Sequence, residues 1–156
     1  MIKQESEVGL VDVYKDLNRI LVSLFNDLID IEEKALITDE FKDISINDMH
    51  IIEAIGTGEP KNMSTVAKAV SVTVGTLTIG INGLVKKGYV IRERGTVDKR
   101  VVYISLTDKG YRAYKHHELF HKNMALFIMD KLSEEEAIVL VSSLNKMSEY
   151  FNNLRK

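Results

Sequence analysis

The sequence predicts a mainly α-helical fold that contains one small β-hairpin. Apolar residues recur at steps of three and four near both ends of the 156-residue chain, which is the spacing of amphipathic helices. The apolar period changes to two only around residues 89–106, where valine, isoleucine and tyrosine are frequent. The chain has one proline and no cysteine, so a disulfide framework, a thiolate nucleophile and a cysteine-ligated zinc are excluded.

A long amphipathic helix is predicted near each end of the chain. The apolar positions of the first are Leu10, Tyr14, Leu17, Leu21, Leu24, Leu28 and Ile31. Those of the last are Ala137, Leu140, Leu144, Met147, Phe151 and Leu154. Ser133 and Glu136 have the spacing of a capping box at the start of the last helix. We expect the two helices to pair, within the subunit or between subunits.

Shorter helices are predicted between them. Ser45 is expected to cap one helix, and Ser64 to cap a short second one. A tight turn around Ser71 leads to Thr73, which caps a third helix that Gly88 closes.

A basic hairpin follows the third helix. Its strands are predicted at 89–94 and 101–106, with a loop at 95–98, and Thr107 then caps a long helix. Helix, tight turn, helix and hairpin is the order of a winged helix-turn-helix. We expect that domain at residues 37–111, with a helical dimerisation region formed by residues 1–36 and 112–156.

Charge is unevenly distributed, although the formal net charge is only −2. Residues 1–60 contain five basic and 14 acidic residues, residues 61–115 contain 11 and three, and residues 116–156 contain five and six. A basic middle between acidic ends is typical of a domain that meets phosphates on one face. We therefore expect double-stranded DNA as a partner.

The third helix carries three interior glycines, each of which costs about 1 kcal/mol of helix stability relative to alanine. Helical projection predicts a core face made of Val74, Leu77, Ile81, Leu84 and Val85. The opposite face carries Gly75, Thr76, Ile79, Asn82, Gly83 and Lys86. Such a face suits close approach to a DNA groove, whereas Gly80 points sideways and is assigned to packing against the preceding helix.

The predicted contacts with DNA divide by chemistry. Thr76, Ile79 and Asn82 are expected to discriminate bases, because they offer methyl groups and an amide to base edges. Lys86, Arg94, Lys99 and Arg100 are expected to contact phosphates or the minor groove, with Asp98 holding an arginine in position. The complete predicted set is Ser64, Thr73, Gly75, Thr76, Thr78, Ile79, Asn82, Lys86, Arg92, Arg94, Asp98, Lys99 and Arg100.

These motifs resemble the MarR family of winged helix-turn-helix regulators. The stretch 98–110 is similar to the wing signature of that family, an Asp-x-Arg followed by Leu-Thr-x-x-Gly, and residues 84–90 resemble the end of its recognition helix. The resemblance covers nearly the whole chain. It implies a homodimer built by the terminal helices, with two recognition helices in successive major grooves of a pseudo-palindrome. Many members have arginine where Ile79 and Gly83 stand here, so reading by apolar contact and shape is expected instead.

Within the family, residues 41–56, 73–78 and 120–122 look most like the repressors of bacterial fatty-acid biosynthesis genes. This resemblance implies a transcriptional repressor whose corepressor is a long-chain acyl group on acyl carrier protein. No cofactor is required on this interpretation.

Four residues raise a rival effector. His117 and His121 are spaced i, i+4, and the zinc-responsive repressors of the same family resemble this chain in having a glutamate and three histidines, here Glu32, His50, His117 and His121. The interpretation that we favour is that these histidines have a structural role or serve a polar hydrogen-bond network, and a part in ligand sensing is a third alternative.

Catalysis is not expected, since the chain has no nucleophile with its base, no phosphate loop and no paired carboxylates in an apolar pattern. The alternative outside DNA binding is a winged-helix module that grips a protein through Ile79. No basic flank precedes an apolar run at the N-terminus, and charge interrupts every apolar stretch before bilayer length. We therefore expect a cytoplasmic protein with no membrane partner.

Overall fold

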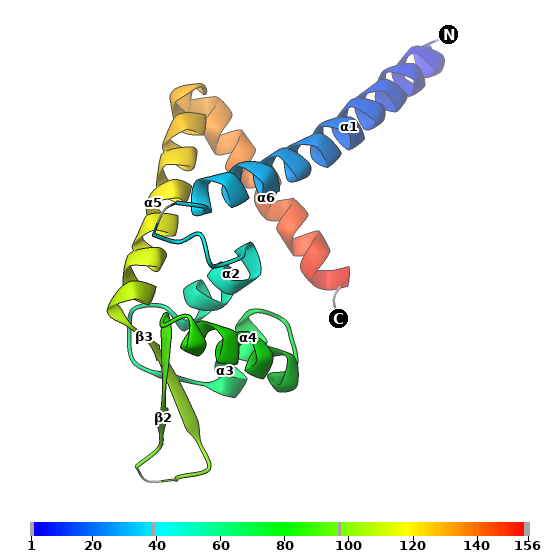
Figure 1. Cartoon of the computed structure of the whole chain (residues 1–156). Helices are drawn as coiled ribbons and strands as arrows, with labels where there is room; N and C mark the ends of the chain where they lie inside the picture. The colour runs from blue at the N-terminus through cyan, green and yellow to red at the C-terminus, as the bar shows by residue number, and fades with distance from the viewer. Residues whose placement is uncertain (1, 39, 97, 155–156) are drawn as a thin grey trace. The chain divides into compact units, whose positions relative to one another are not determined.

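The computed structural model describes residues 2–38, 40–96 and 98–154, with side chains from Asp12 onward. The elements in these residues are α1 (Ile2–Leu36), α2 (Ile46–Ile55), β1 (Lys61–Asn62), α3 (Met63–Ala69), α4 (Val74–Lys86), β2 (Val90–Arg94), β3 (Val102–Leu106), α5 (Asp108–Asp130) and α6 (Glu134–Leu154) (Figure 1). The chain divides into two compact units, of which the first ends at His117 and the second begins at Glu118. The side chain of Leu10, residue 97 of the predicted loop, and residues 1, 39, 155 and 156 of the predicted regions lie outside the described part.

The core of the first unit lies between α2, α3, α4 and the sheet. From α4 it receives Leu77, Ile81 and Leu84, each at most 1% exposed. The predicted core face was wrong at its margins, because Val74 is 44% and Val85 40% exposed. The buried side of this helix is therefore a stripe spaced i, i+4, i+7, and the apolar residues that flank it face outward.

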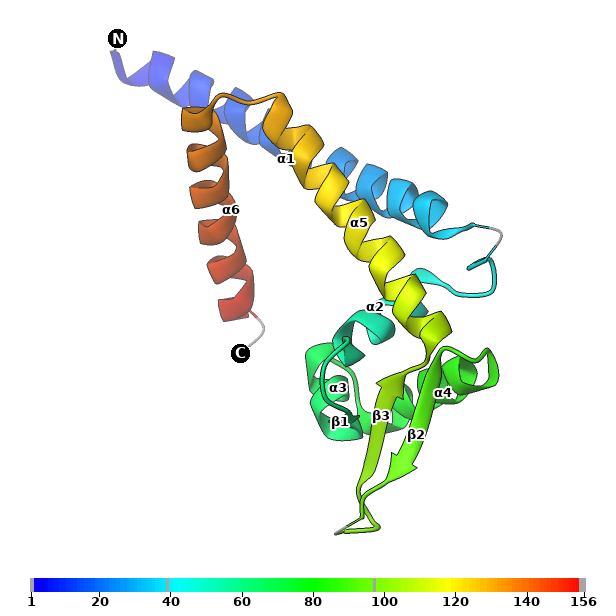
Figure 2. The same cartoon turned by 90° about the vertical axis from the view of Figure 1, so that its left-hand side faces the viewer.

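The sheet has three antiparallel strands in the order β1-β3-β2. In its register Arg92 of β2 and Lys61 of β1 both pair with Ile104 of β3, which is fully buried. The predicted hairpin is confirmed, with β3 beginning at Val102. The strand β1 was not predicted, because two residues are too few for a period to be visible. Figure 2 shows the β2–β3 hairpin projecting beyond α3 and α4 as a wing.

The predicted start of the short helix α3 was wrong by two residues. Asn62, not Ser64, is the N-cap, since the Asn62 side chain accepts a hydrogen bond from the Thr65 amide at 2.9 Å. Ser64 lies exposed inside the first turn of α3. Asparagine and serine are both strong N-caps, and the pairing of β1 places Asn62 at the helix start.

The predicted caps at the other helices agree with the structure. Ser45 and Asp48 form a capping box on α2, with hydrogen bonds of 3.1 and 3.2 Å. Ser133 and Glu136 form another on α6, at 2.8 and 3.3 Å. In both pairs the hydroxyl and the carboxylate each accept a free backbone amide of the first turn.

The terminal helices keep much of their apolar surface exposed. On α1 the exposed side chains include Tyr14, Leu17, Leu24 and Ile31, and on α6 they include Leu140, Leu144, Phe151 and Leu154. In the second unit the only buried hydrophobic residue among those described is Ala137.

No single helix in the described residues has both the length and the apolar composition to cross a membrane. The pair α3 and α4 has them only when taken together, with a bend of 102° between the two helices.

Candidate nucleic-acid interface

The exposed face of α4 has the composition that the sequence predicted. Ile79 is 75% exposed, and Thr76, Asn82 and Lys86 are exposed with it. These residues lie opposite the stripe that α4 buries. An isoleucine side chain that is three-quarters exposed among small polar residues indicates a surface used for contact.

The three glycines of α4 have different structural reasons. A Cβ added at Gly83 would meet no described atom within 4 Å beyond its own helix backbone, and one at Gly75 would meet only the Thr73 Oγ1 at 3.7 Å. A Cβ at Gly80 would lie 2.6 Å from Cδ1 of Ile51. Close packing therefore explains Gly80, as expected, although its neighbour is α2 rather than the predicted α3. Gly75 and Gly83 have no such internal explanation, and both lie on the exposed side with Ile79.

The turn between α3 and α4 is tight and well defined. Ser71 has φ of 57°, and the Val72 amide donates to the Ala67 carbonyl at 3.0 Å. Thr73 caps α4 by accepting the Thr76 amide at 3.1 Å. The hydroxyls of Thr73 and Thr76 lie 3.0 Å apart, so the cap also orients the first polar group of the exposed face. The helix-turn-helix geometry predicted from the sequence is confirmed.

Thr78 differs from the other threonines of this helix. Its hydroxyl donates to the Val74 carbonyl at 2.7 Å and its side chain is only partly exposed. It lines a hollow of about 380 Å³ between α4 and the wing, together with Met63, Arg92, Glu93, Arg94 and Val102. A contact from Thr78 to DNA stays a prediction, and it would be made from the side of α4 that faces the wing.

The wing carries exposed cations on β2 and on the segment that leads into β3. Arg92 and Arg94 lie on one face of β2, and Lys99 and Arg100 follow the tip, all of them exposed. Asp98 accepts hydrogen bonds from the Arg100 backbone amide at 2.9 Å and from its guanidinium at 3.2 and 3.3 Å. The bond from the Arg100 backbone amide, and after it the bonds from the guanidinium, lower the pKa of Asp98. The prediction that Asp98 positions an arginine is therefore confirmed for Arg100.

The basic residues of this region fall into two groups. Lys68, Lys86 and the wing cations are exposed, so they are available to phosphates. Lys61, Lys87 and Lys109 instead make internal bonds: Lys61 to the Ala54 carbonyl, Lys87 to Asp48 and Lys109 to Asp43. The contact surface is therefore more restricted than the positive charge of the segment suggests.

Comparison with known proteins agrees with this geometry. The family model described as transcriptional regulator SarA/Rot matches residues 34–119. The structure is similar to that of Streptococcus pneumoniae FabT in complex with DNA, with a TM-score of 0.86, 41% identity, and coverage of 90% of this chain and 99% of FabT. This chain belongs to the MarR family of winged helix-turn-helix transcriptional regulators.

Curated members of this family are also similar in sequence. Staphylococcus aureus SarZ is 34% identical over 115 residues, covering 73% of this chain and 76% of SarZ. Bacillus subtilis PchR is 28% identical over 107 residues, covering 67% of this chain, and the match spans 63% of PchR. Both are described as HTH-type transcriptional regulators, so this MarR-family chain groups with regulators rather than enzymes.

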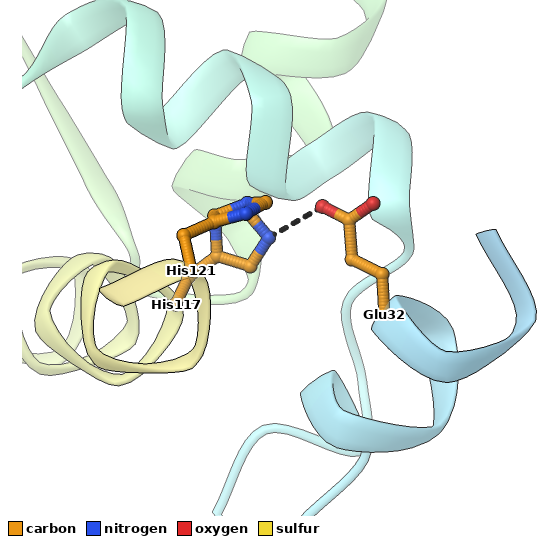
Figure 3. A group of neighbouring side chains, drawn as sticks. All are labelled: Glu32, His117 and His121. Carbon is orange, nitrogen blue, oxygen red and sulfur yellow. Dashed lines mark hydrogen bonds and ion pairs between the residues drawn. The ribbon is translucent and has the colours of Figure 1, made fainter. Parts of the chain in front are cut away.

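A second cluster of this MarR-family chain lies around His117, which is 1% exposed. Its Nε2 lies 2.7 Å from Glu32 of α1 and its Nδ1 lies 2.8 Å from Glu53 of α2 (Figure 3 shows the bond to Glu32). His50 approaches Glu32 at 3.9 Å, whereas His121 follows one turn further along α5, in the second unit. The structure thus brings Glu32, His50 and His117 of the first unit close together, and Glu53 is a member of this cluster that sequence reasoning missed.

Two carboxylates determine the protonation of His117. Both ring nitrogens can donate at once only in the imidazolium form. Burial lowers the pKa of His117, but the hydrogen bonds and charges of Glu53 and Glu32 outweigh burial and raise it above the usual value. A metal bound by His117 would have to displace a carboxylate from one of these nitrogens, so the arrangement favours the polar-network interpretation.

Proposed function

We propose that this regulator is a repressor that binds a pseudo-palindromic operator in double-stranded DNA as a homodimer, with α4 of each copy in the major groove. The observation that carries the proposal is the face around Ile79. It combines a side chain that is 75% exposed with two glycines that internal packing does not require. Methyl groups at this position suit thymine, and the exposed Asn82 amide suits adenine.

The wing supplies the complementary part of the interface. Arg94, Lys99 and Arg100 are exposed and add positive charge on the wing, outside α4. Contacts of this kind position a protein on the duplex and dominate its salt-dependent affinity. The proposal therefore assigns base discrimination to α4 and phosphate or minor-groove contacts to the wing.

Dimerisation follows from the apolar surface of the terminal helices. Leu24 and Ile31 of α1 and Leu144 of α6 are each about half exposed, which is costly for a solvated helix. Along α6 an apolar groove of about 680 Å³ includes Ile138 and Val141. A second copy would cover such surfaces, and the two recognition helices of the dimer, one from each copy, would then read two half-sites.

The proposed targets are fatty-acid biosynthesis genes, and the proposed corepressor is acyl carrier protein that bears a long-chain acyl group. Support comes from the sequence resemblance to that subgroup of repressors and from the 41% identity to FabT. Zinc is the alternative effector, and the observation in its favour is that Glu32, His50 and His117 gather in one unit. Both effectors would act on the same DNA-binding activity.

A salt-resolved binding titration tests this proposal. The full chain is titrated against promoter DNA of a fatty-acid biosynthesis operon and against a scrambled duplex, alone, with long-chain acyl carrier protein, and with zinc. Tighter binding to the promoter with the acylated carrier is expected. Tightening by zinc alone would assign the protein to metal homeostasis, and weak binding with equal affinity for both duplexes would return the Ile79 face to a protein partner.

A further inference from the structure

The end of α4 is held by a polar cluster that the DNA-reading face does not include. Tyr89 follows α4 and precedes β2, and its ring is fully buried. Its hydroxyl donates to Asp43 Oδ1 at 2.6 Å. Lys109, in the first turn of α5, donates to Asp43 Oδ2 at 3.3 Å and to the Lys87 carbonyl at 3.2 Å. We call Asp43, Tyr89 and Lys109 the Asp43 cluster.

The polar groups of the Asp43 cluster all interact with one another. Both oxygens of Asp43 accept a hydrogen bond, and the Lys109 ammonium also lies 4.0 Å from the centroid of the Tyr89 ring. The bond from Tyr89 lowers the pKa of Asp43 most; burial, the next effect in size, raises it, and the bond and charge of Lys109 lower it again, so that the net shift is downward. Asp43 therefore stays ionised at neutral pH and both donors keep a charged acceptor.

The backbone on the far side of Tyr89 is fixed to α5. The Thr107 hydroxyl donates to the Gly88 carbonyl at 2.6 Å, and the Thr107 amide donates to the Tyr89 carbonyl at 3.0 Å. A Cβ at Gly110 would lie 2.1 Å from that same carbonyl, so the first turn of α5 touches it directly. The connection between α4 and β2 is thus bonded to the start of α5. Asp43 bonds the same connection to the segment 40–45 that leads into α2.

Apolar packing keeps α4 against the core, but by itself it does not fix the position of α4 along the helix axis. The buried stripe of Leu77, Ile81 and Leu84 is non-directional, whereas hydrogen bonds lose strength quickly when distances or angles change. Asn82 lies in the last turn or so of α4, which ends at Lys86, and Tyr89 follows three residues after the end of that helix. A shift at the end of α4 is therefore transmitted to the base-reading side chains.

We propose that Asp43, Tyr89 and Lys109 are positioning residues that set the placement of α4 against α5 and the segment before α2, and thereby set sequence discrimination. The inference rests on the proposed function, since it assigns the cluster to DNA reading. The cluster touches no DNA in this account. It acts through α4 and couples it to helices outside the helix-turn-helix.

Tyr89→Phe is the sharpest test, because it removes one hydroxyl and leaves the charge and the ring in place. The probe is a duplex that the wild-type protein enriches from a random pool, compared with a scrambled duplex of the same length. We expect affinity for the enriched duplex to fall about three- to tenfold, which is less than the roughly 12- to 160-fold that the whole free energy of one hydrogen bond to a charged acceptor would give, because the bond acts on binding only through the placement of α4. Affinity for the scrambled duplex and its salt dependence should stay unchanged.

Glu40→Gln is the matched control. The Arg112–Glu40 bond of 2.6 Å also connects α5 to the segment before α2, but neither residue makes a described bond to α4. This variant should keep the wild-type ratio between the two duplexes. If Tyr89→Phe does not fold, Asp43→Asn is the second variant. The Asp43 side chain is partly exposed, so this substitution leaves the apolar core intact, and it should reproduce the loss of discrimination.

Several outcomes would overturn the inference. Equal loss on both duplexes, an unchanged ratio with only a lower unfolding temperature, or the same loss in Glu40→Gln would reduce the cluster to general stabilisation. A wild-type protein that enriches no sequence would instead overturn the proposed function, and the role of the cluster with it.

Discussion

Gly83 lowers the stability of α4, and in return it leaves space on the exposed face of the helix for close approach to DNA. No described atom would contact a Cβ there, and its helix loses backbone entropy without gaining packing. Gly83→Ala should therefore raise the free energy of unfolding by about 1 kcal/mol while it weakens operator binding, because the methyl group would stand between helix and groove. Urea denaturation and a DNA titration measure the two effects.

Gly80→Ala is the control for this prediction. Its Cβ would press on Ile51, so no comparable gain in stability is expected. If Gly83→Ala bound the operator as tightly as the wild type, the close approach of α4 to DNA would be contradicted.

His117 should make stability depend on pH. Because Glu53 and Glu32 raise its folded-state pKa above the unfolded value of about 6.5, its contribution is complete below about pH 6.5 and is lost as the pH rises through the folded pKa. The free energy of unfolding should thus decrease as the pH rises above about 6.5. Glu53→Gln removes one carboxylate and should flatten this dependence, and an equally steep curve in the variant would contradict the assignment.

At this scale the sequence predicted faces better than partners. Ile79 and Asn82 could be placed on the exposed face of α4 from the helical period alone, since position on a helix is a local property. Glu53 opposite His117 could not be predicted, because the two residues are 64 positions apart and meet only through packing. The same reason explains why Gly80 was assigned to the wrong neighbouring helix.

Among the elements, α3 provides a direct test of its start. Asn62→Ala should cost about 1 kcal/mol of stability, which is typical for the loss of an N-cap, whereas Ser64→Ala should be nearly neutral. The reason is that the Asn62 side chain, not that of Ser64, accepts the Thr65 amide. Chemical denaturation of the two variants in parallel decides between them, and the opposite order would restore Ser64 as the cap.

The elements themselves could mostly be predicted, because caps and periods are encoded locally. Thr73, Ser45 and Ser133 stood where helices begin, and the change of period predicted the wing. The strand β1 is different, since Lys61 and Asn62 become a strand only by pairing with Ile104 and Tyr103. The Asp43 cluster was missed for a related reason: its members come from three parts of the chain that are far apart in sequence.

For the whole molecule, the exposed apolar surface of the terminal helices predicts self-association. Leu144→Glu places a charge in that surface on α6, where the side chain is 50% exposed in the single chain. The folded variant should sediment as a monomer, or as a dimer weakened by at least about tenfold, because burying an unpaired charge is costly. Circular dichroism controls for folding. A variant that stays fully dimeric at the same concentration would place the interface elsewhere.

The order of elements along the chain and the basic middle segment were both predictable and together indicated a winged helix-turn-helix. Effector identity was not, because the residues around His117 suit a polar network and resemble a metal site at the same time. Such ambiguity arises where one set of side chains serves two chemistries.

The central claim is that α4 reads bases while the wing holds the backbone. It is tested most directly by titrating Asn82→Ala and Arg100→Ala against an operator duplex, its single-base variants and a scrambled duplex. Asn82→Ala should cost about 1–3 kcal/mol mainly at one base pair, whereas Arg100→Ala should weaken binding to all duplexes and reduce the salt dependence. Equal losses for both variants on scrambled DNA would contradict the claim.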